Sequence, residues 1–218
     1  MKSLHTLLYI FLAAYCAVSC GNSKKTVVEA VAVGPDFSAD SAYAYCAAQC
    51  DFGPRLMNTP EHDKCGDWIE AKFQQFGMAV SRQETVVKGY DGTPLNCRNI
   101  IARFRPDNKE RILLCAHWDC RPWADNDPDS TNWRKPVMGA NDGASGVAVM
   151  LEIARLLQRA DSINIGVDFV CFDAEDWGVP QWSEADYDGD SWALGAQYWA
   201  KKAHSEGYTA RFGILLDM

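Results

Sequence analysis

The stretch RILLCAHWD, residues 111–119, decides the fold class of this chain. Residues 112–116 are apolar at every position, so a strand formed here would be buried on both faces. Strands of that kind are typical of parallel sheets that carry helices on both sides. The polar residues His117 and Asp119 come directly after the apolar run. The stretch therefore predicts a central strand with functional side chains at its carboxyl end.

Strand and helix patterns alternate on both sides of this stretch. Thr59 and Pro60 can cap a helix that Gly77 ends, and a second amphipathic pattern begins near Gly143. Helices are expected at 59–77, 143–159 and 192–204, and strands at 78–87, 99–104, 111–116, 165–172 and 212–217. Buried strands separated by helices predict an α/β fold, a three-layer α/β/α sandwich with a mostly parallel central sheet.

The overall composition excludes several classes of protein. The 218 residues carry a net charge of −8, and 48% of them are hydrophobic. That apolar fraction is too high for a disordered chain, and the length suits one large domain. The acidic excess leaves no basic surface of the kind that phosphate backbones require, so nucleic-acid binding is not expected. After the N-terminus, no apolar run approaches the roughly 20 residues that span a bilayer.

The N-terminal segment has the pattern of an export signal. Lys2 precedes an apolar run from Leu7 to Val18, and Cys20 follows small residues before the sequence turns polar. We expect a lipoprotein signal peptide at 1–20, with cleavage at Cys20 and a lipid attached to that cysteine. Residues 21–37 would then be a linker and residues 38–218 the folded domain. The segment predicts an exported bacterial lipoprotein, anchored to a membrane in the periplasm.

Disulfide pairing stays open from the sequence. Of nine cysteines, two fall in the export segment and seven remain, so at least one has no intramolecular partner. Cys115 and Cys171 lie inside apolar strand patterns, where a cysteine usually acts as a small hydrophobe. The sequence has no Cys-x-x-Cys spacing, so a thiolate zinc site is not expected.

Acidic residues gather where the expected strands end and where one helix begins. Asp119 follows one strand, Asp142 opens a helix, the acids of 173–176 follow another strand, and Asp217 follows a third. In open α/β sheets the carboxyl ends of parallel strands meet at one ligand-binding edge. So many carboxylates would repel one another unless a cation held them. Carboxylate oxygens with a histidine nitrogen are ligands that suit zinc.

Four motifs in this order resemble one enzyme family. They are ILLCAHWD at 112–119, GANDGASG at 139–146, FDAED at 172–176 and LLDM at 215–218. Together they are similar to the M28 family of zinc aminopeptidases and glutaminyl cyclases. Within that family the chain looks closest to bacterial glutaminyl cyclases that resemble the animal enzyme. The resemblance runs from about Asp51 to the last residue, with Gly53-Pro54-Arg55 also in family style.

The resemblance implies a role for each matching residue. Asp142 and Asp176 match zinc ligands, although many relatives carry glutamate at the second position. The third ligand of the family is a histidine from a later segment, which this chain lacks. Glu175 matches the catalytic acid and base, and Asp217 matches the acid that orients the reacting amide. Trp182 resembles the tryptophan that lines the substrate pocket, and a packed loop aromatic is an equal alternative.

The implied activity is zinc-dependent glutaminyl-peptide cyclotransfer, which closes an N-terminal glutamine of a peptide to pyroglutamate and releases ammonia. The alternative is an M28 aminopeptidase, in which His117 and Asp217 complete a second zinc site bridged by Asp142. A third reading is a surface lipoprotein that binds a ligand without turnover. The histidines His5, His62, His117 and His204 leave no third ligand for the first zinc. We therefore expect a domain that is incomplete at its C-terminus and inactive as this chain alone.

Two loops carry weaker signals. The acidic and tryptophan-containing stretch 121–138 is long enough to be a lid over the site, and a solvated insertion is as plausible. Asp186 to Asp190 resembles a calcium loop, but its glycine comes too early and Gln197 stands where a glutamate is required. The segment is interpreted as a solvated turn before a helix.

Overall fold

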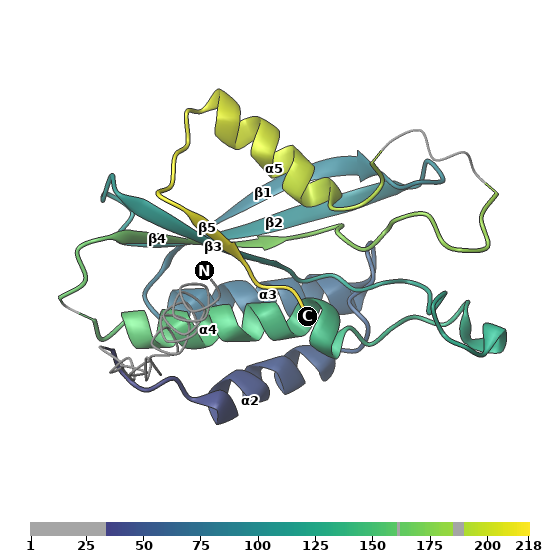
Figure 1. The fold of residues 1–218 in the computed structure, drawn as a ribbon, viewed down its shortest axis with the longest axis horizontal. Coiled ribbons are helices and arrows are strands. Elements are labelled where there is room, and N and C mark those ends of the chain that lie inside the picture. Colours follow the sequence, from purple (N-terminus) through teal and green to yellow (C-terminus); the bar gives the residue numbers. More distant parts are fainter. Residues whose placement is uncertain (1–33, 161, 185–189) are drawn as a thin grey trace, which may run out of the picture. The chain divides into compact units, whose positions relative to one another are not determined.

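A five-stranded sheet forms the centre of the domain in the computed structural model, which describes residues 34–160, 162–184 and 190–218. The expected signal peptide and most of the linker lie outside these residues, as does most of the calcium-like loop. The strands are β1 (Ala79–Lys88), β2 (Pro94–Phe104), β3 (Arg111–His117), β4 (Gly166–Phe172) and β5 (Gly213–Leu215). Their spatial order is β1-β2-β4-β3-β5 (Figure 1).

The sheet is mixed in direction. Strand β3 pairs in parallel with both β4 and β5, whereas β2 pairs antiparallel with both β1 and β4. The α/β class is confirmed, and the expectation of a mostly parallel sheet is corrected to equal shares of parallel and antiparallel pairs. The connection between β1 and β2 is only residues 89–93, and a turn that short can join antiparallel strands but not parallel ones.

Helices cover both faces of the sheet. They are α2 (Ala39–Cys50), α3 (Pro60–Gln75), α4 (Gly146–Leu157) and α5 (Leu194–Ser205), together with a π-helical turn η2 (Ala140–Ser145) and a 3₁₀ turn η1 (Ser130–Asn132). Figure 1 shows α3 and α4 on one face and α5 on the other, and α2 packs on α4. The expected three-layer arrangement is therefore present. No helix among the described residues is long and apolar enough to span a membrane.

The main core lies between the sheet and the pair α3 and α4. Phe73 of α3 packs on Phe169 of β4 with ring centroids 5.3 Å apart, and Met150 of α4 belongs to the same cluster. A smaller cluster lies under α5, where Phe172 meets Trp199. Strand β4 is buried at every position because it has helices on both faces. The central strands are thereby held rigidly, and their carboxyl ends are fixed in space.

The local signals mostly agree with the observed boundaries. The Thr59 side chain caps α3 at the backbone N–H of His62, with Pro60 at the first helical position, as expected. The helix expected from Gly143 begins only at Gly146, because Asp142 and Gly143 have non-helical backbone angles inside η2. That kink turns the Asp142 side chain toward the end of β3. All seven cysteines of the described residues are free thiols, and five of them are buried.

Candidate metal centre and catalytic site

The predicted site residues meet at one edge of the sheet. His117 is the last residue of β3, Asp217 lies just past β5, and Glu175 and Asp176 follow β4. These three strands are parallel neighbours, so their carboxyl ends lie at the same edge. Asp142 reaches the same edge from η2. The convergence expected from the sequence is therefore present.

Three side chains form a compact cluster at this edge. His117 Nε2 lies 2.8 Å from Asp142 Oδ1 and 3.7 Å from Asp217 Oδ1. One potential ligand atom from each of the three residues lies within 4.8 Å of the others. His117 is 4% exposed, whereas Asp142 and Asp217 are partly open to solvent. The set matches the second zinc site of the aminopeptidase alternative.

The donor set of this cluster fits zinc. One imidazole nitrogen and two carboxylate oxygens are ligand types that zinc takes, and two open carboxylates leave room for a substrate atom. Burial opposes the charged form of His117, but Asp119, Asp142 and Glu175 outweigh it and raise its pKa to about 11. The imidazolium is thus the local cation among these acids. A bound zinc ion could take that role in place of the proton.

Glu175 stands beside the cluster. Its Oε2 lies 3.8 Å from His117 Nδ1, and its side chain is 29% exposed. Burial, together with repulsion from Asp119, Asp142 and Asp217, raises its pKa to about 7, although His117 acts in the opposite direction. A carboxyl group with a pKa near neutrality is suited to both accept and donate a proton.

Asp176 lies at the same edge but has a different partner. Its Oδ1 lies 3.2 Å from Nη1 of Arg121, and the residue is 4% exposed. Burial and the nearby acids, Asp119 first, raise its pKa to about 8 despite the guanidinium. Among the described residues, Asp176 does not belong to the cluster of His117, Asp142 and Asp217. The pairing of Asp142 with Asp176 on one zinc therefore stays a prediction.

The turn that carries Glu175 and Asp176 is held on both sides. The Asp119 carboxylate accepts hydrogen bonds from the backbone N–H groups of Glu175 and Asp176, both at 3.1 Å. On the other side, the carbonyls of residues 173–175 accept bonds from the N–H groups of residues 193–195 at the start of α5. Ala174 takes a positive φ of 51° within this turn. The two acids therefore project from a fixed backbone.

Asp173 and His62 form a buried pair that supports the same turn. The Asp173 carboxylate accepts a hydrogen bond from the backbone N–H of Arg98 at 2.7 Å and lies 2.8 Å from His62 Nε2. The His62 ring stacks on Trp118, with centroids 4.0 Å apart. Although burial disfavours the charged imidazole, Asp173 outweighs it and raises the pKa of His62. The pair anchors helix α3 to the end of β4.

Trp182 lies in an aromatic cluster between two loops. Its ring is 5.8 Å from Trp123 and 6.2 Å from Trp133, and the Arg134 guanidinium lies 3.9 Å from its centroid. The loop 121–138, expected as a lid or a solvated insertion, thus packs on the segment that carries Trp182. The role of Trp182 in a substrate pocket stays a prediction.

Two buried arginines of the site were not identified from the sequence. Arg121 pairs with Asp125 as well as with Asp176, at 2.6 and 2.7 Å for the two Asp125 oxygens. Arg55 donates to backbone carbonyls beside His117 and before η2. Gly53-Pro54-Arg55 was the only signal for Arg55, and an arginine that binds carbonyls leaves no spacing pattern to detect. For Arg121, the acid four residues later was a weak signal.

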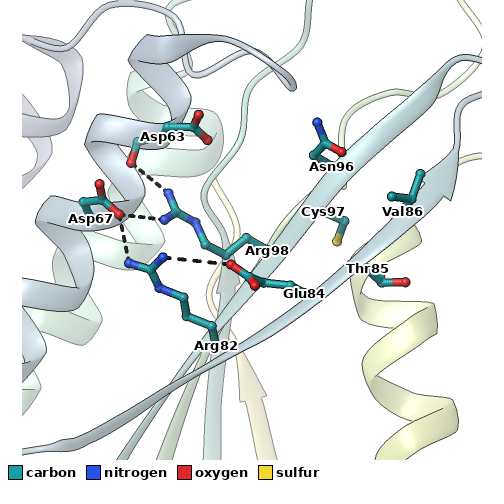
Figure 2. Close-up of a pocket in the computed structure, with 9 residues that line it drawn as sticks. All are labelled: Asp63, Asp67, Arg82, Glu84, Thr85, Val86, Asn96, Cys97 and Arg98. Carbon is teal, nitrogen blue, oxygen red and sulfur yellow. Dashed lines mark hydrogen bonds and ion pairs between the residues drawn. The ribbon is translucent and has the colours of Figure 1, made fainter.

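A separate pocket lies between α3 and the β1–β2 hairpin and shares none of the predicted site residues (Figure 2). Arg98 donates to Asp67 Oδ1 at 2.7 Å and to the Asp63 carbonyl at 2.8 Å. Arg82 also reaches Asp67, at 3.0 Å, and it pairs with Glu70. The arginines are thus engaged by acids and a carbonyl of α3, so this network braces the helix against the sheet.

Comparison with known proteins agrees with this geometry. The sequence profile of Peptidase family M28 matches residues 99–218. A Bacteroides thetaiotaomicron glutaminyl cyclase bound to N-acetylhistamine is 52% identical with a TM-score of 0.82, over 85% of this chain and 63% of that chain. A leucine aminopeptidase precursor from the same organism is 52% identical with a TM-score of 0.83, over 86% and 64%.

A Zn-dependent exopeptidase from Parabacteroides distasonis is 53% identical with a TM-score of 0.81, over 84% of this chain and 62% of that chain. The chain spans less than two thirds of each of these structures and less than half of the length of the curated relatives it matches. The profile match covers more than half of the chain and includes every residue of the cluster. The chain belongs to peptidase family M28.

Proposed function

We propose that the protein is a glutaminyl-peptide cyclotransferase, which closes the N-terminal glutamine of a peptide to pyroglutamate and releases ammonia. The observation that carries the proposal is the place of Glu175, 3.8 Å from His117 yet outside the cluster of metal-ligand atoms. A carboxylate in that position can exchange protons with a substrate held at the cluster. The similarity to the Bacteroides thetaiotaomicron cyclase supports this choice.

The proton transfers fall to residues of this chain. Glu175 accepts a proton from the α-amine of the substrate as the α-nitrogen forms a bond to the side-chain amide carbon. The bond from that carbon to the amide nitrogen then breaks, and Glu175 delivers the same proton to the departing ammonia. Asp217 accepts a hydrogen bond from the leaving nitrogen and so orients it. The rigid turn that bears Glu175 keeps the carboxylate in reach of both nitrogens.

Zinc is part of the proposal. Asp142 and Asp176 would hold the ion, and His117 would join only if a second ion binds. When bound, zinc supplies a Lewis acid that polarises the amide carbonyl of the substrate. Trp182 would line the pocket, with its ring orientation set by Trp133 and Arg134.

A second candidate, a zinc aminopeptidase, rests on one specific observation. His117, Asp142 and Asp217 form the cluster expected for a second metal. In that case Glu175 would accept a proton from a water molecule that attacks the first peptide bond. The sequence favours the cyclase, since Trp118, Asp176 and Trp182 resemble the corresponding residues of glutaminyl cyclases more closely than those of aminopeptidases. The similar structures include both a cyclase and an aminopeptidase precursor.

We also propose that the protein is an exported lipoprotein held at a periplasmic membrane surface through Cys20. The segment that carries this signal lies outside the described residues. Its substrates would then be peptides or proteins with an N-terminal glutamine that reach the same compartment.

The test uses zinc-loaded protein expressed from its complete reading frame and a peptide that begins with glutamine. Mass spectrometry should find a product that has lost ammonia and kept the residue. Release of free glutamine would support the aminopeptidase instead. If neither product forms, both enzyme proposals are contradicted.

The variant Glu175→Gln should lower turnover by about 10²- to 10⁴-fold, the usual contribution of a general acid and base. Glu110→Gln is a matched control because the Glu110 side chain is 71% exposed and pairs with Arg211 near the start of β3. Equal turnover in the two variants would overturn the role of Glu175.

A further inference from the structure

Arg55 is a fully buried cation beside the candidate metal centre. Its side chain is 0% exposed. Its hydrogen bonds in the described part of the chain all go to backbone carbonyls: Nε donates to Trp118 at 3.1 Å, Nη1 to Met138 at 2.7 Å, and Nη2 to Gly139 at a very short distance. A guanidinium presents its donors in a rigid planar fork, so three such bonds fix three backbone positions relative to one another.

The three carbonyls belong to the two segments that carry the cluster. Trp118 directly follows His117 at the end of β3. Met138 and Gly139 directly precede η2, the turn that contains Asp142. A hydrogen bond of 3.0 Å from the Val137 N–H to the Arg121 carbonyl also joins the two segments. At the cluster itself they meet through the contact of 2.8 Å between His117 Nε2 and Asp142 Oδ1. One guanidinium therefore bridges the backbones that set this separation.

The packing around the guanidinium leaves it little freedom. Gly139 has a φ of 63°, and a Cβ atom there would lie 2.8 Å from Arg55 Nη2. Gly143 has a φ of 102°, and a Cβ atom there would lie 3.3 Å from the same nitrogen. The backbone of η2 approaches Arg55 closely because both positions are glycine. Any change in the position of the Arg55 guanidinium should therefore displace the backbone of η2.

We infer that Arg55 is a positioning residue for the metal centre: its guanidinium sets the separation of His117 and Asp142. The inference rests on the proposed function through Asp142, which would hold zinc in the cyclase and bridge the two metals in the aminopeptidase, so it does not depend on which reaction follows. Supporting groups of this kind change metal affinity without touching the metal, because they orient the ligands.

Arg111 provides a matched control at the opposite end of β3. It is also buried, at 8% exposed, and its guanidinium also donates to backbone carbonyls, those of Arg105 at 2.9 Å and Asn108 at 3.0 Å. Its remaining donors pair with Asp168. A lysine at either position keeps the charge and loses the planar fork. Both substitutions should lower the melting temperature, so stability alone does not separate the two roles.

The experiment compares Arg55→Lys with Arg111→Lys in the full chain. In metal-free protein labelled with ¹⁵N-histidine, the Nε2 resonance of His117 should move toward its position in Asp142→Asn for the Arg55 variant only. Titration with Zn²⁺ against a chromophoric chelator should show a Kd raised about 10- to 100-fold for the Arg55 variant and unchanged for the Arg111 variant.

If both lysine variants leave the His117 resonance unchanged, or shift it equally, the inference is wrong. Arg55→Gln is the second variant should Arg55→Lys fail to fold, since its side-chain amide keeps two hydrogen-bond donors at this buried position but lacks the planar fork of three donor nitrogens. It should shift the same resonance, and an unshifted resonance would equally overturn the inference. The spectra need neither metal nor substrate, so failure of the cyclase assay leaves this result standing.

Discussion

Gly143, next to Asp142, is a position where a single added methyl group should disturb the site. Its φ is 102°, and a Cβ atom would lie 2.5 Å from the carbonyl oxygen of Asp119. We expect Gly143→Ala to lower the free energy of unfolding by roughly 2–6 kcal/mol, from backbone strain and overpacking together. Urea denaturation followed by circular dichroism measures this loss.

Gly207→Ala is the control for that substitution. Gly207 also has a positive φ, 69°, but a Cβ atom there would have no neighbour within 4 Å. Only the conformational penalty of about 1 kcal/mol should remain. Similar losses at the two glycines would show that the close approach of Asp119 to η2 does not constrain the site.

The sequence could predict which acids converge, but not what holds them. His117, Asp142, Glu175 and Asp217 each stand at the end of a recognisable strand or the start of a helix, so topology alone brings them together. Arg55 and Arg121 escaped prediction for a different reason. The partners of Arg55 are backbone carbonyls of residues 118, 138 and 139, and carbonyls are present at every position of a chain. Such contacts become visible only in three dimensions.

The junction of α2 and α4 depends on one buried acid. Glu152 is 0% exposed, and its carboxylate accepts hydrogen bonds from the Ser38 N–H at 3.0 Å and from Arg155 at 2.7 Å. The bonds from Arg155 lower the pKa of Glu152 below its ordinary value. Its stabilising effect is therefore complete above the unfolded-state pKa of about 4.3 and is lost as the pH falls through the lower folded-state pKa.

Glu152→Gln should lower the free energy of unfolding at pH 7 by about 1–3 kcal/mol, the cost of weakening buried hydrogen bonds to a charged group. The variant should also lose part of the acid sensitivity of the parent protein between pH 5 and pH 3. Glu110→Gln, at an exposed ion pair, should change stability by less than about 0.5 kcal/mol. Equal effects of the two substitutions in chemical denaturation would contradict this role of Glu152.

Element boundaries were predictable where caps and apolar runs agree, as in α3 and β4. Strand direction could not be predicted, because an apolar run has the same pattern in a parallel and in an antiparallel strand. Strand β2 in fact pairs antiparallel with β4. Helix α2 was not anticipated, since the apolar residues of 39–50 are spread around the helix and Ala42 is the one among them that is buried. Its place is set by packing on α4 and by Glu152 rather than by its own pattern.

Across the whole molecule, the metal-free protein should become less stable as the pH rises from 6 to 8. Glu175 and Asp176 have pKa values of about 7 and 8, well above those of the unfolded chain. Their stabilising effect is therefore complete below about pH 4 and is lost progressively as the pH rises from there to those values. His117 acts in the same direction: its pKa of about 11 lies above the unfolded value of about 6.5, and its stabilising effect is lost progressively between those two values. Carboxylates with lowered pKa values, such as Asp125, are fully ionised throughout this window.

The loss between pH 6 and pH 8 should be roughly 3–6 kcal/mol. Zn²⁺ should raise the melting temperature more at pH 8 than at pH 6, because its ligands bind it in their deprotonated forms. Thermal scans with and without a chelator measure both effects. The double variant Glu175→Gln, Asp176→Asn should flatten the metal-free profile, and an undiminished slope would place its origin elsewhere.

Strand β5 joins the site to the sheet through contacts between residues that are far apart in the sequence. The Cys115 thiol bonds to the Ile214 carbonyl, and the two residues are 99 positions apart in the sequence. Strands β1 and β2 can pair through a short turn, but Asp217 reaches His117 only after this long loop has closed. Loop closure over such a distance is entropically slow compared with hairpin formation. We therefore expect the edge that carries His117 and Asp217 to form late in folding, after the strands and helices that support it have packed.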